Sequence, residues 1–334
     1  MPVNILAIES SCDETAAAVI QNGKILSNVI ASQQEHNQYG GVVPELASRV
    51  HVQKIIPVVH EALLKADITT NKLSAIAFTA GPGLIGSLMV GSSFAKAMAM
   101  ALNVPVIGVH HMQAHIHAHF ISNSIPAFPF LCLTVSGGHT QIVLVKGYLE
   151  MKIVGETIDD AAGEAFDKTA KLLKLPYPGG PLIDRYAKLG NANAFDFPEP
   201  KIKDFDFSFS GLKTSILYFL KEKEKENKNF IQERLNDICA SVQSRIVSIL
   251  LNKLKRAAEE FEIKEIALAG GVSSNSLLRN EAQKIADKKG WNLYLPMYEF
   301  CTDNAAMIAS VAYHKYLENK FDTLSIAPQP RIVW

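Results

Sequence analysis

A pattern of strand, turn, strand, turn and strand occurs twice in the chain, and this repeat limits the possible folds more than any other feature. The predicted strands of the two copies cover residues 4–9, 15–20 and 24–31, and residues 130–135, 140–145 and 149–155. Each strand is a short apolar run bounded by polar or Gly-containing turns, as is typical of β-hairpins. Aligning Thr15 with Thr140 gives an offset of about 125 residues, so the sequence predicts an internal duplication.

A second repeated unit supports the duplication. Its two copies, each a strand, a Gly-containing loop and a helix, cover residues 75–102 and about 265–286. The offset here is about 189 residues, so the second copy carries about 64 extra residues, in the stretch that holds residues 179–181 and 207–213. Because a strand, a glycine loop and a helix follow one another in many α/β proteins, this pair alone does not establish a duplication.

The duplication predicts an α/β fold of two ribonuclease-H-like lobes that face a central cleft. We expect an N-terminal lobe over residues 1–125, which includes a His-rich helix, and a C-terminal lobe over residues 126–334, which includes a helical insertion. The last helix could also pack back on the N-terminal lobe. The turns at Ser10-Ser11 and at Ser136–Gly138 expose backbone N–H groups, so a ligand with phosphates could contact one turn from each lobe.

The balance of charges argues against a protein that holds nucleic acid by bulk electrostatics alone. The 334 residues include 33 Lys and Arg and 33 Asp and Glu, for a formal net charge of +0, whereas such proteins usually carry a basic excess. A local basic groove, or one that a partner supplies, stays open. The hydrophobic content of 48% is sufficient for a substantial core.

The cysteines and the apolar segments favour a soluble cytoplasmic protein that does not enter a membrane. The 4 cysteines are far apart and form no Cys-x-x-Cys pair, so a disulfide framework or a thiolate zinc site is not expected. Residues 1–9 lack the basic start of a signal peptide. Residues 74–95 are uncharged and long enough to span a bilayer, but their glycines and serines fit a strand, a loop and a helix better.

The segment His110–His119 is the most informative part of the chain for chemistry. His111, His115 and His119 are spaced at i, i+4 and i+8, so they project from one face of a helix. Two imidazoles one turn apart can bind a divalent metal ion together with an acidic ligand from elsewhere, and iron and zinc both fit. A histidine-lined helix surface and hydrogen-bonded core histidines are the alternatives. The segment is not a His-Glu-x-x-His peptidase motif, because residues 112–114 offer no carboxylate.

Three further segments each have a structural and a functional interpretation. Thr302 or Asp303, which precede a helix to about residue 318, are typical of a helix N-cap. Glu164 and Asp167 follow the acidic start of a helix, where they could complement the helix dipole or hold ribose hydroxyls or an amino-acid side chain. Asn275 could cap its helix or reach a base or a phosphate.

Ten segments together resemble one family over about residues 5 to 331. They are residues 8–15, GGVVPELASR (40–49), TAGPGLIGSL (79–88), the His111-x-x-x-His115 pair, SGGHTQ (136–141), DDAAGEAFDKTAKLL (159–173), YPGGP (177–181), FSFSGLKT (207–214), GGVSSNSLLR (270–279) and CTDNAAMIA (301–309). Motifs of this length are highly specific. The chain resembles the bacterial tRNA N6-adenosine threonylcarbamoyltransferases, once described as sialoglycoprotein endopeptidases.

The resemblance implies an actin/hexokinase-type ATPase fold and a transferase activity. The donor would be threonylcarbamoyl-adenylate, and the acceptor would be N6 of the adenosine 3′ of the anticodon, in tRNAs that read codons beginning with adenine. It implies that His111, His115 and Asp303 hold one divalent metal ion per subunit, with iron favoured and zinc possible. It also implies that nine residues contact the adenylate: Thr134, Val135, Ser136, Gly137, Gly138, Asp167, Gly180, Asp184 and Asn275.

The resemblance further implies partners, and the chain departs from the family at one point. Family members work with a catalytically silent paralogue of the same fold and with a P-loop ATPase subunit, and a separate enzyme makes the donor. Many relatives have Glu-Gly where this chain has Gln113-Ala114. The implied ligands are unaffected, but the local negative charge near the metal falls by one, so the metal preference could differ.

The residues themselves are compatible with acyl transfer. The adenosine amine would attack the carbamoyl carbon, and AMP would leave. The N–H groups of Gly137 and Gly138 could stabilise developing negative charge or the departing phosphate. Because an exocyclic aromatic amine is a weak nucleophile, a base would help, and Asp13 and Glu14 in the first hairpin turn are the candidates.

Three other classes of protein stay open on the sequence alone. A metal-dependent glycoprotein endopeptidase would need a water-activating carboxylate beside the metal, which the His-rich helix lacks. A sugar or small-molecule kinase of the same fold would hold magnesium by carboxylates and phosphates rather than by two histidines. A non-catalytic nucleotide-binding scaffold would not need the complete His, His and Asp set.

Overall fold

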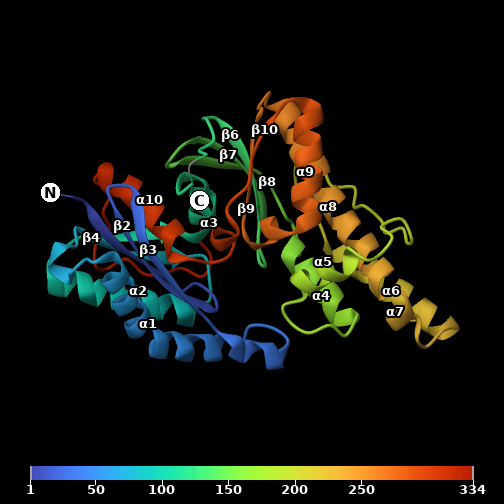
Figure 1. The fold of residues 1–334 in the computed structure, drawn as a ribbon, viewed down its shortest axis with the longest axis horizontal. Coiled ribbons are helices and arrows are strands. Elements are labelled where there is room, and N and C mark those ends of the chain that lie inside the picture. Colours follow the sequence, from blue (N-terminus) through green and yellow to red (C-terminus); the bar gives the residue numbers. More distant parts are fainter. Residues whose placement is uncertain (1, 123, 333–334) are drawn as a thin grey trace. The chain divides into compact units, whose positions relative to one another are not determined.

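The computed structural model describes residues 2–122 and 124–332, and the chain divides into two units, each built on a five-stranded sheet (Figure 1). Unit 1 comprises Met1–Ile125, Gly147–Met151 and Pro296–Trp334. Unit 2 comprises Pro126–Lys146 and Lys152–Leu295.

The sheet of unit 1 combines a three-stranded antiparallel meander with two parallel strands. In the order β3, β2, β1, β4, β5 across the sheet, the strands are Lys24–Ser32, Glu14–Gln21, Asn4–Glu9, Ala75–Gly81 and Val106–His110. β1 pairs antiparallel with β2 and parallel with β4, so it occupies the centre. The carboxyl ends of β1, β4 and β5 therefore meet at one edge of the sheet.

Helices cover both faces of this sheet, which explains why β1 is a continuous apolar run. Leu6 and Ile8 pack on one side with α1 (Pro44–Ala66) and α2 (Ile85–Leu102). Ile5 and Ala7 point to the other side, where α3 (His111–His117) and α10 (Ala305–Leu317) lie. Because side chains alternate along a strand, β1 contributes to two separate cores.

The sheet of unit 2 repeats the order of the first. From β8 across to β10, the strands β8, β7, β6, β9 and β10 are Glu150–Glu156, Thr140–Gly147, Phe130–Val135, Glu265–Ala269 and Asn292–Tyr294. β6 pairs antiparallel with β7 and parallel with β9, as β1 does with β2 and β4. The predicted duplication is confirmed.

The extra residues of the second copy are mostly helical, although residues 190–209 between α5 and α6 are irregular. Its helices are α4 (Ala162–Leu172), α5 (Gly179–Ala187), α6 (Ser210–Glu226), α7 (Phe230–Glu233), α8 (Leu235–Glu260) and α9 (Ser276–Lys289). Short 3-10 helices are η1 (Gln34–Tyr39), η2 (Thr70–Lys72), η3 (Ala118–Phe120), η4 (Gly271–Ser274) and η5 (Tyr298–Phe300). In unit 1, one α-helix (α1) and two short 3-10 helices (η1 and η2) separate β3 from β4, whereas α4 to α8 separate β8 from β9 in unit 2. Buried Phe166, Phe207 and Phe209 join these helices to the sheet in one core.

The predicted boundary between residues 125 and 126 placed all later residues in the C-terminal lobe. In the structure, two of these later segments belong to unit 1: residues 147–151 and residues 296–334. The second segment packs in unit 1 because of the amino-acid composition of α10. Its residues 305–312 are all buried, and five of the eight are Ala or Ser. Such small side chains allow the helix to approach β1 and β2 closely.

The chain beyond α10 contacts β5 from its first residue and reaches the ends of β4 and β5. The Asp322 backbone N–H donates to the carbonyl oxygen of Val106 at 3.0 Å, and that of Gln329 donates to Ala80 at 2.8 Å. His110 Nε2 lies 3.4 Å from the carbonyl oxygen of Ile332. This segment therefore supports the residue that directly precedes His111.

The apolar helix α2 is, by length and composition alone, the one helix of the described chain that could cross a membrane. It belongs instead to the core of unit 1, because Leu88, Ala95 and Ala99 are buried and α2 packs against α1 and β4. The structure accordingly resolves residues 75–102 as strand, loop and helix, as the sequence predicts.

Candidate functional site

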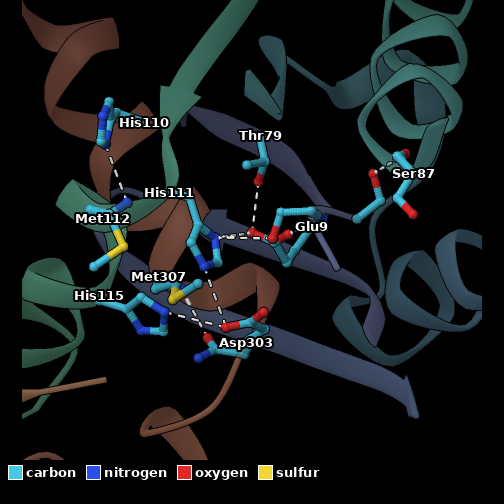
Figure 2. Close-up of polar contacts among 12 residues, drawn as sticks. Glu9, Thr79, Ser87, His110, His111, Met112, His115, Asp303 and Met307 are labelled. Atoms are coloured by element: carbon cyan, nitrogen blue, oxygen red, sulfur yellow. Dashed lines mark hydrogen bonds and ion pairs between the residues drawn. The ribbon is translucent and has the colours of Figure 1, made fainter. Parts of the chain in front are cut away.

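Two histidines of α3 and one aspartate converge at the carboxyl edge of the unit 1 sheet (Figure 2). His111 and His115 lie one helical turn apart, directly after β5. Nε2 of His111 lies 3.4 Å from Oδ1 of Asp303, and Nε2 of His115 lies 3.2 Å from the same oxygen. The three candidate ligand atoms all lie within 4.8 Å of one another. The residues implied by the resemblance are therefore brought together.

Asp303 is available because its neighbour caps α10. The sequence favoured Thr302 or Asp303 as the N-cap, and this prediction is wrong. Oδ1 of Asn304 accepts a hydrogen bond from the backbone N–H of Met307 at 3.0 Å, and Nδ2 of Asn304 donates to the carbonyl oxygen of Thr302 at 2.8 Å. With the helix end satisfied by Asn304, the carboxylate of Asp303 turns to the histidines.

The electrostatics of this group favour a bound cation. Burial alone would raise the pKa of Asp303, but the neighbouring His111 and hydrogen bonds from both histidines lower it. Burial alone would lower the pKa of His111, but Asp303 and Glu9 raise it well above its usual value. The carboxylates of Glu9 and Asp303 thus favour a positive charge at this position, as a proton or as a divalent ion.

The donor set fits a transition metal. Two imidazole nitrogens and one carboxylate oxygen at bond lengths of about 2.0–2.1 Å would lie roughly 3.3 Å apart in tetrahedral coordination, close to the 3.2 and 3.4 Å found here. The third histidine of the predicted face does not join them. α3 ends at His117, and His119 belongs to η3, so the i+8 position is no longer on the same helical face.

Glu9 is a functional candidate that the sequence analysis missed. It ends β1, is fully buried, and its Oε2 lies 3.0 Å from Nδ1 of His111. Burial would raise the pKa of Glu9, but the neighbouring His111 lowers it, so the carboxyl group is ionised. The signal was a carboxylate at the end of an otherwise apolar strand, because a buried charge requires a partner.

Asp13 lies in the turn between β1 and β2, Glu14 is the first residue of β2, and the turn is hydrogen-bonded to the start of α2. The Leu84 backbone N–H donates to the carbonyl oxygen of Ser11 at 2.7 Å, and Ser10 Oγ donates to that of Ser87 at 3.0 Å. Burial, together with the carboxylates of Asp303 and Asp13, raises the pKa of Glu14 to about 9. Glu14 therefore lies in the electrostatic field of the metal ligands.

In unit 2, the candidate adenylate residues of β6 lie where the strand ends. Thr134 and Val135 are its last residues and are buried, and Gly137 and Gly138 are exposed in the following turn. The Ser136 backbone N–H donates to the carbonyl oxygen of His139 at 2.8 Å, which closes the turn. A Cβ on Gly163, near the start of α4, would overlap the carbonyl oxygen of Ser136 and lie 2.8 Å from Cα of Gly137. This turn therefore packs directly on α4.

The remaining candidates form two hydrogen-bonded groups on neighbouring helices. Oδ1 of Asp167 accepts from the backbone N–H of Gly179 at 2.8 Å and from that of Gly180 at 3.2 Å. Oδ1 of Asp184 accepts from the backbone N–H of Ser276 at 3.2 Å and from its hydroxyl at 2.7 Å. These bonds join α4 to α5 and α5 to α9.

The side chain of Asn275 makes hydrogen bonds to two other residues of the protein. Its Oδ1 accepts from the backbone N–H of Leu278 at 3.0 Å, which caps α9, and its Nδ2 donates to Oε1 of Gln243 at 3.0 Å. Of the two interpretations that the sequence left open, the cap is therefore present.

Burial raises the pKa of Asp167, the candidate on α4, in spite of the hydrogen bonds from the backbone N–H groups of Gly179 and Gly180.

Comparison with known proteins agrees with the resemblance seen in the sequence. The family model TsaD, tRNA N6-adenosine threonylcarbamoyltransferase, matches residues 24–310. The chain is 59% identical to the tRNA N6-adenosine threonylcarbamoyltransferase of Cytophaga hutchinsonii over 332 residues, which cover 99% of this chain and 97% of the relative. It is 58% identical to that of Christiangramia forsetii, with 98% of each chain covered.

Solved structures with low sequence identity share the fold. HypF from T. kodakarensis superposes with a TM-score of 0.64 at 17% identity, over 96% of this chain and 49% of that protein. Component A of the (R)-2-hydroxyglutaryl-CoA dehydratase of Acidaminococcus fermentans superposes with a TM-score of 0.52 at 14% identity, over 94% of this chain and 99% of that one. The predicted actin/hexokinase-type fold is confirmed. By its sequence, the chain belongs to the tRNA N6-adenosine threonylcarbamoyltransferases, a family of tRNA-modifying transferases.

Proposed function

We propose that this enzyme transfers the threonylcarbamoyl group of threonylcarbamoyl-adenylate to N6 of the adenosine 3′ of the anticodon in tRNAs that read codons beginning with adenine. The observation that carries this proposal is the identity of 58–59% with curated relatives over nearly the whole chain, together with the complete His111, His115 and Asp303 group. In the reaction the N6 amine attacks the carbamoyl carbon, a C–N bond forms, the C–O bond to phosphate breaks and AMP leaves.

Unit 2 would bind the adenylate part of the donor. The carboxyl ends of β6 and β9 are adjacent because these strands are parallel neighbours, and the Ser136–Gly138 turn follows β6 there. In this proposal the exposed N–H groups of Gly137 and Gly138 hold phosphate oxygens, as backbone amides in short turns commonly do. The groups around Asp167 with Gly180 and around Asp184 would bind the nucleoside, and Asn275 would order the start of α9 beside them.

The residue that removes the amine proton would come from the β1–β2 turn. Glu14 holds its own proton near neutral pH in the metal-free protein, because burial and two nearby carboxylates raise its pKa to about 9. Asp13 is therefore the preferred proton acceptor, and Glu14 would act as a hydrogen-bond donor. Both lie in unit 1, which also contains the metal ligands.

The resident metal would be a single divalent ion per subunit held by His111, His115 and Asp303. Two imidazoles and one carboxylate suit iron and zinc, and we favour iron. When bound, such an ion supplies Lewis-acid polarisation of donor oxygens. Its identity can be measured by elemental analysis of protein purified without oxygen.

The decisive experiment is reconstitution. The purified chain, its partner subunits, threonylcarbamoyl-adenylate and unmodified tRNA are incubated, and the nucleosides of the recovered tRNA are analysed by mass spectrometry. We expect threonylcarbamoyladenosine in tRNAs that read codons beginning with adenine and not in other tRNAs. An Asp303→Ala enzyme serves as the matched control. Absence of the modified nucleoside with the metal-loaded wild type would refute the proposal.

We also propose that the silent paralogue and the P-loop ATPase subunit of the family are partners, in the cytoplasm, and that the paralogue docks on α1 and α2. Six apolar residues of these two helices are exposed: Val52, Ile56, Leu64, Ile85, Met89 and Met100. Their exposed fractions range from 47% for Ile85 to 71% for Leu64, and α1 packs beside α2 (Figure 1). A paralogue of the same fold would present an equivalent pair of helices, so the two faces could pair with each other.

Charge substitutions test this face. Ile56→Glu combined with Met89→Glu should abolish co-elution with the paralogue in size-exclusion chromatography while the isolated chain stays folded. Tyr218→Glu is the control, because Tyr218 is exposed by 66% but lies on α6 of unit 2. Co-elution that survives the double substitution would exclude α1 and α2 as the docking face.

A further inference from the structure

Glu9 lies behind the metal ligand His111, on the side of the imidazole opposite to Asp303 (Figure 2). Nδ1 of His111 lies 3.0 Å from Oε2 of Glu9, and Nε2 of the same ring lies 3.4 Å from Oδ1 of Asp303. We propose that Glu9 is a positioning residue that fixes the tautomer and the orientation of His111 for metal binding. The inference rests on the metal site of the proposed function and adds a residue to it.

The carboxylate of Glu9 is itself held rigidly. Its Oε2 also accepts from the hydroxyl of Thr79 at 2.7 Å, and its Oε1 accepts from the backbone N–H of Ser11 at 2.5 Å. These donors belong to β4 and to the β1–β2 turn, so two neighbouring segments fix the Glu9 carboxylate independently of His111. Ser11 Oγ lies 3.3 Å from Nδ1 of His111 and is therefore the more distant acceptor.

A neutral imidazole carries one proton, and its position decides which nitrogen can bind a metal. With Nδ1–H donating to Glu9, the lone pair of Nε2 faces Asp303, where the metal would lie. The negative charge of Glu9 also raises the basicity of the ring and adds to the charge of Asp303, which favours a divalent cation.

His115 provides an internal comparison. Its side chain is 1% exposed, and its Nδ1 has no hydrogen-bond partner among residues 2–122 and 124–332. The two histidine ligands therefore differ. His111 is oriented by a buried carboxylate, whereas His115 is held by packing and by Asp303 alone. Loss of Glu9 should thus weaken the site through His111.

The test measures metal affinity, not transfer. The full chain and Glu9→Gln are stripped with a chelator, and Zn2+ is titrated in competition with a chromogenic chelator. We expect Glu9→Gln to bind Zn2+ about 10- to 100-fold more weakly than the wild type, the usual effect of losing such a partner. Asp159→Asn is the control, because Asp159 also accepts several hydrogen bonds, from Ser208, Phe209 and Ser210, but lies in unit 2. It should bind within about twofold of the wild type.

A spectroscopic measurement on the zinc-loaded wild type supports or overturns the proposal even if Glu9→Gln does not fold. In 15N-labelled protein we expect His111 to show a protonated Nδ1 and a metal-bound Nε2, with the signal assigned by its loss in His111→Ala. Ligation through Nδ1 would overturn the inference, as would a Glu9→Gln affinity within about twofold of the wild type. A wild type that binds no Zn2+ would overturn the metal site itself as well.

Discussion

His51 of α1 donates from Nε2 to the carbonyl oxygen of Cys12 over 2.9 Å, and this bond ties the first long helix to the turn that carries Asp13 and directly precedes Glu14. Because a carbonyl can only accept, Nε2 carries the proton, and Nδ1 accepts from the hydroxyl of Thr15 at 2.7 Å. Burial lowers the pKa of His51, which keeps the ring neutral and this pair of bonds intact.

His51→Ala should destabilise unit 1 by about 3 kcal/mol, because it opens a cavity and leaves the Cys12 carbonyl and the Thr15 hydroxyl without their partner. Urea unfolding of the metal-free chain, followed by circular dichroism, measures the effect. His60→Ala is the control, because His60 lies on the exposed side of the same helix. Equal losses in the two variants would show that the bond to Cys12 contributes nothing.

Removal of both imidazole ligands should empty the metal site. We expect His111→Ala combined with His115→Ala to contain less than about a tenth of the metal of the wild type, because one carboxylate alone holds a transition metal weakly. His119→Gln should retain its metal, since His119 is not part of the ligand group. Inductively coupled plasma mass spectrometry measures both. Full metal content in the double variant would refute the assignment of the ligands.

Asp13→Ala should slow transfer much more than it weakens donor binding. Loss of a general base typically costs about 10²- to 10⁴-fold in rate, whereas the adenylate would be bound by unit 2. Single-turnover transfer to tRNA gives the rate, and titration with a non-reactive donor analogue gives the affinity. A wild-type rate in the variant would exclude a role as base, and a parallel loss of affinity would indicate a binding role instead.

Gly163→Ala should weaken binding of the donor analogue about tenfold, the effect of losing about 1.4 kcal/mol. The new Cβ would overlap the carbonyl oxygen of Ser136, so the turn with Gly137 and Gly138 must move. Gly211→Ala is the matched control. Gly211 lies at the start of α6, and a Cβ there meets no atom within 4 Å. Unchanged affinity in Gly163→Ala would show that the turn does not bind the donor.

The stability of the chain should fall as the pH falls below about 6.5, in part because of His117. This buried ring has Nδ1 3.1 Å from Oγ of Ser310 and Nε2 2.7 Å from the carbonyl oxygen of Tyr148, and burial lowers its pKa to about 3. In the unfolded chain the pKa of this histidine is about 6.5. Between pH 6.5 and pH 3 the unfolded chain therefore binds a proton that the folded chain does not, and folding becomes less favourable, by about 2 kcal/mol at pH 5.

His117→Gln tests this dependence, because a glutamine can make both hydrogen bonds without titrating. Urea unfolding at pH 7.5 and pH 5.0 should show that the wild type loses about 2 kcal/mol more than the variant over this interval. The other histidines titrate in both proteins and cancel in the comparison. Identical losses would mean that His117 is protonated in the folded protein.

The parts of the fold that depend on local patterns could be predicted from the sequence. β1 and β6 begin and end at the predicted residues, because a buried strand is a compact apolar run and the residues around it form turns. The repeat also predicted two similar lobes, and in the structure β1 pairs with β4 as β6 pairs with β9.

Features that depend on distant residues could not be predicted in this way. Asn304, not Asp303, caps α10, and Asp303 instead contacts histidines from a distant part of the chain. The role of Glu9 was not visible, since nothing within β1 indicates that Thr79 and His111 converge on it. The resemblance, not the residue pattern, supplied Asp303 as a ligand.

Unit 1 is completed by a part of the chain that is synthesised long after its sheet. Its sheet is made of residues 4–110, but one face is covered by α10, and Asp303 lies directly before that helix. At about 5–20 residues per second, the ribosome delivers α10 roughly 10 to 40 s after β5. During that interval the apolar face of β1 lacks α10 and the two histidines of α3 lack Asp303, so the candidate metal site can form only after α10 has been synthesised.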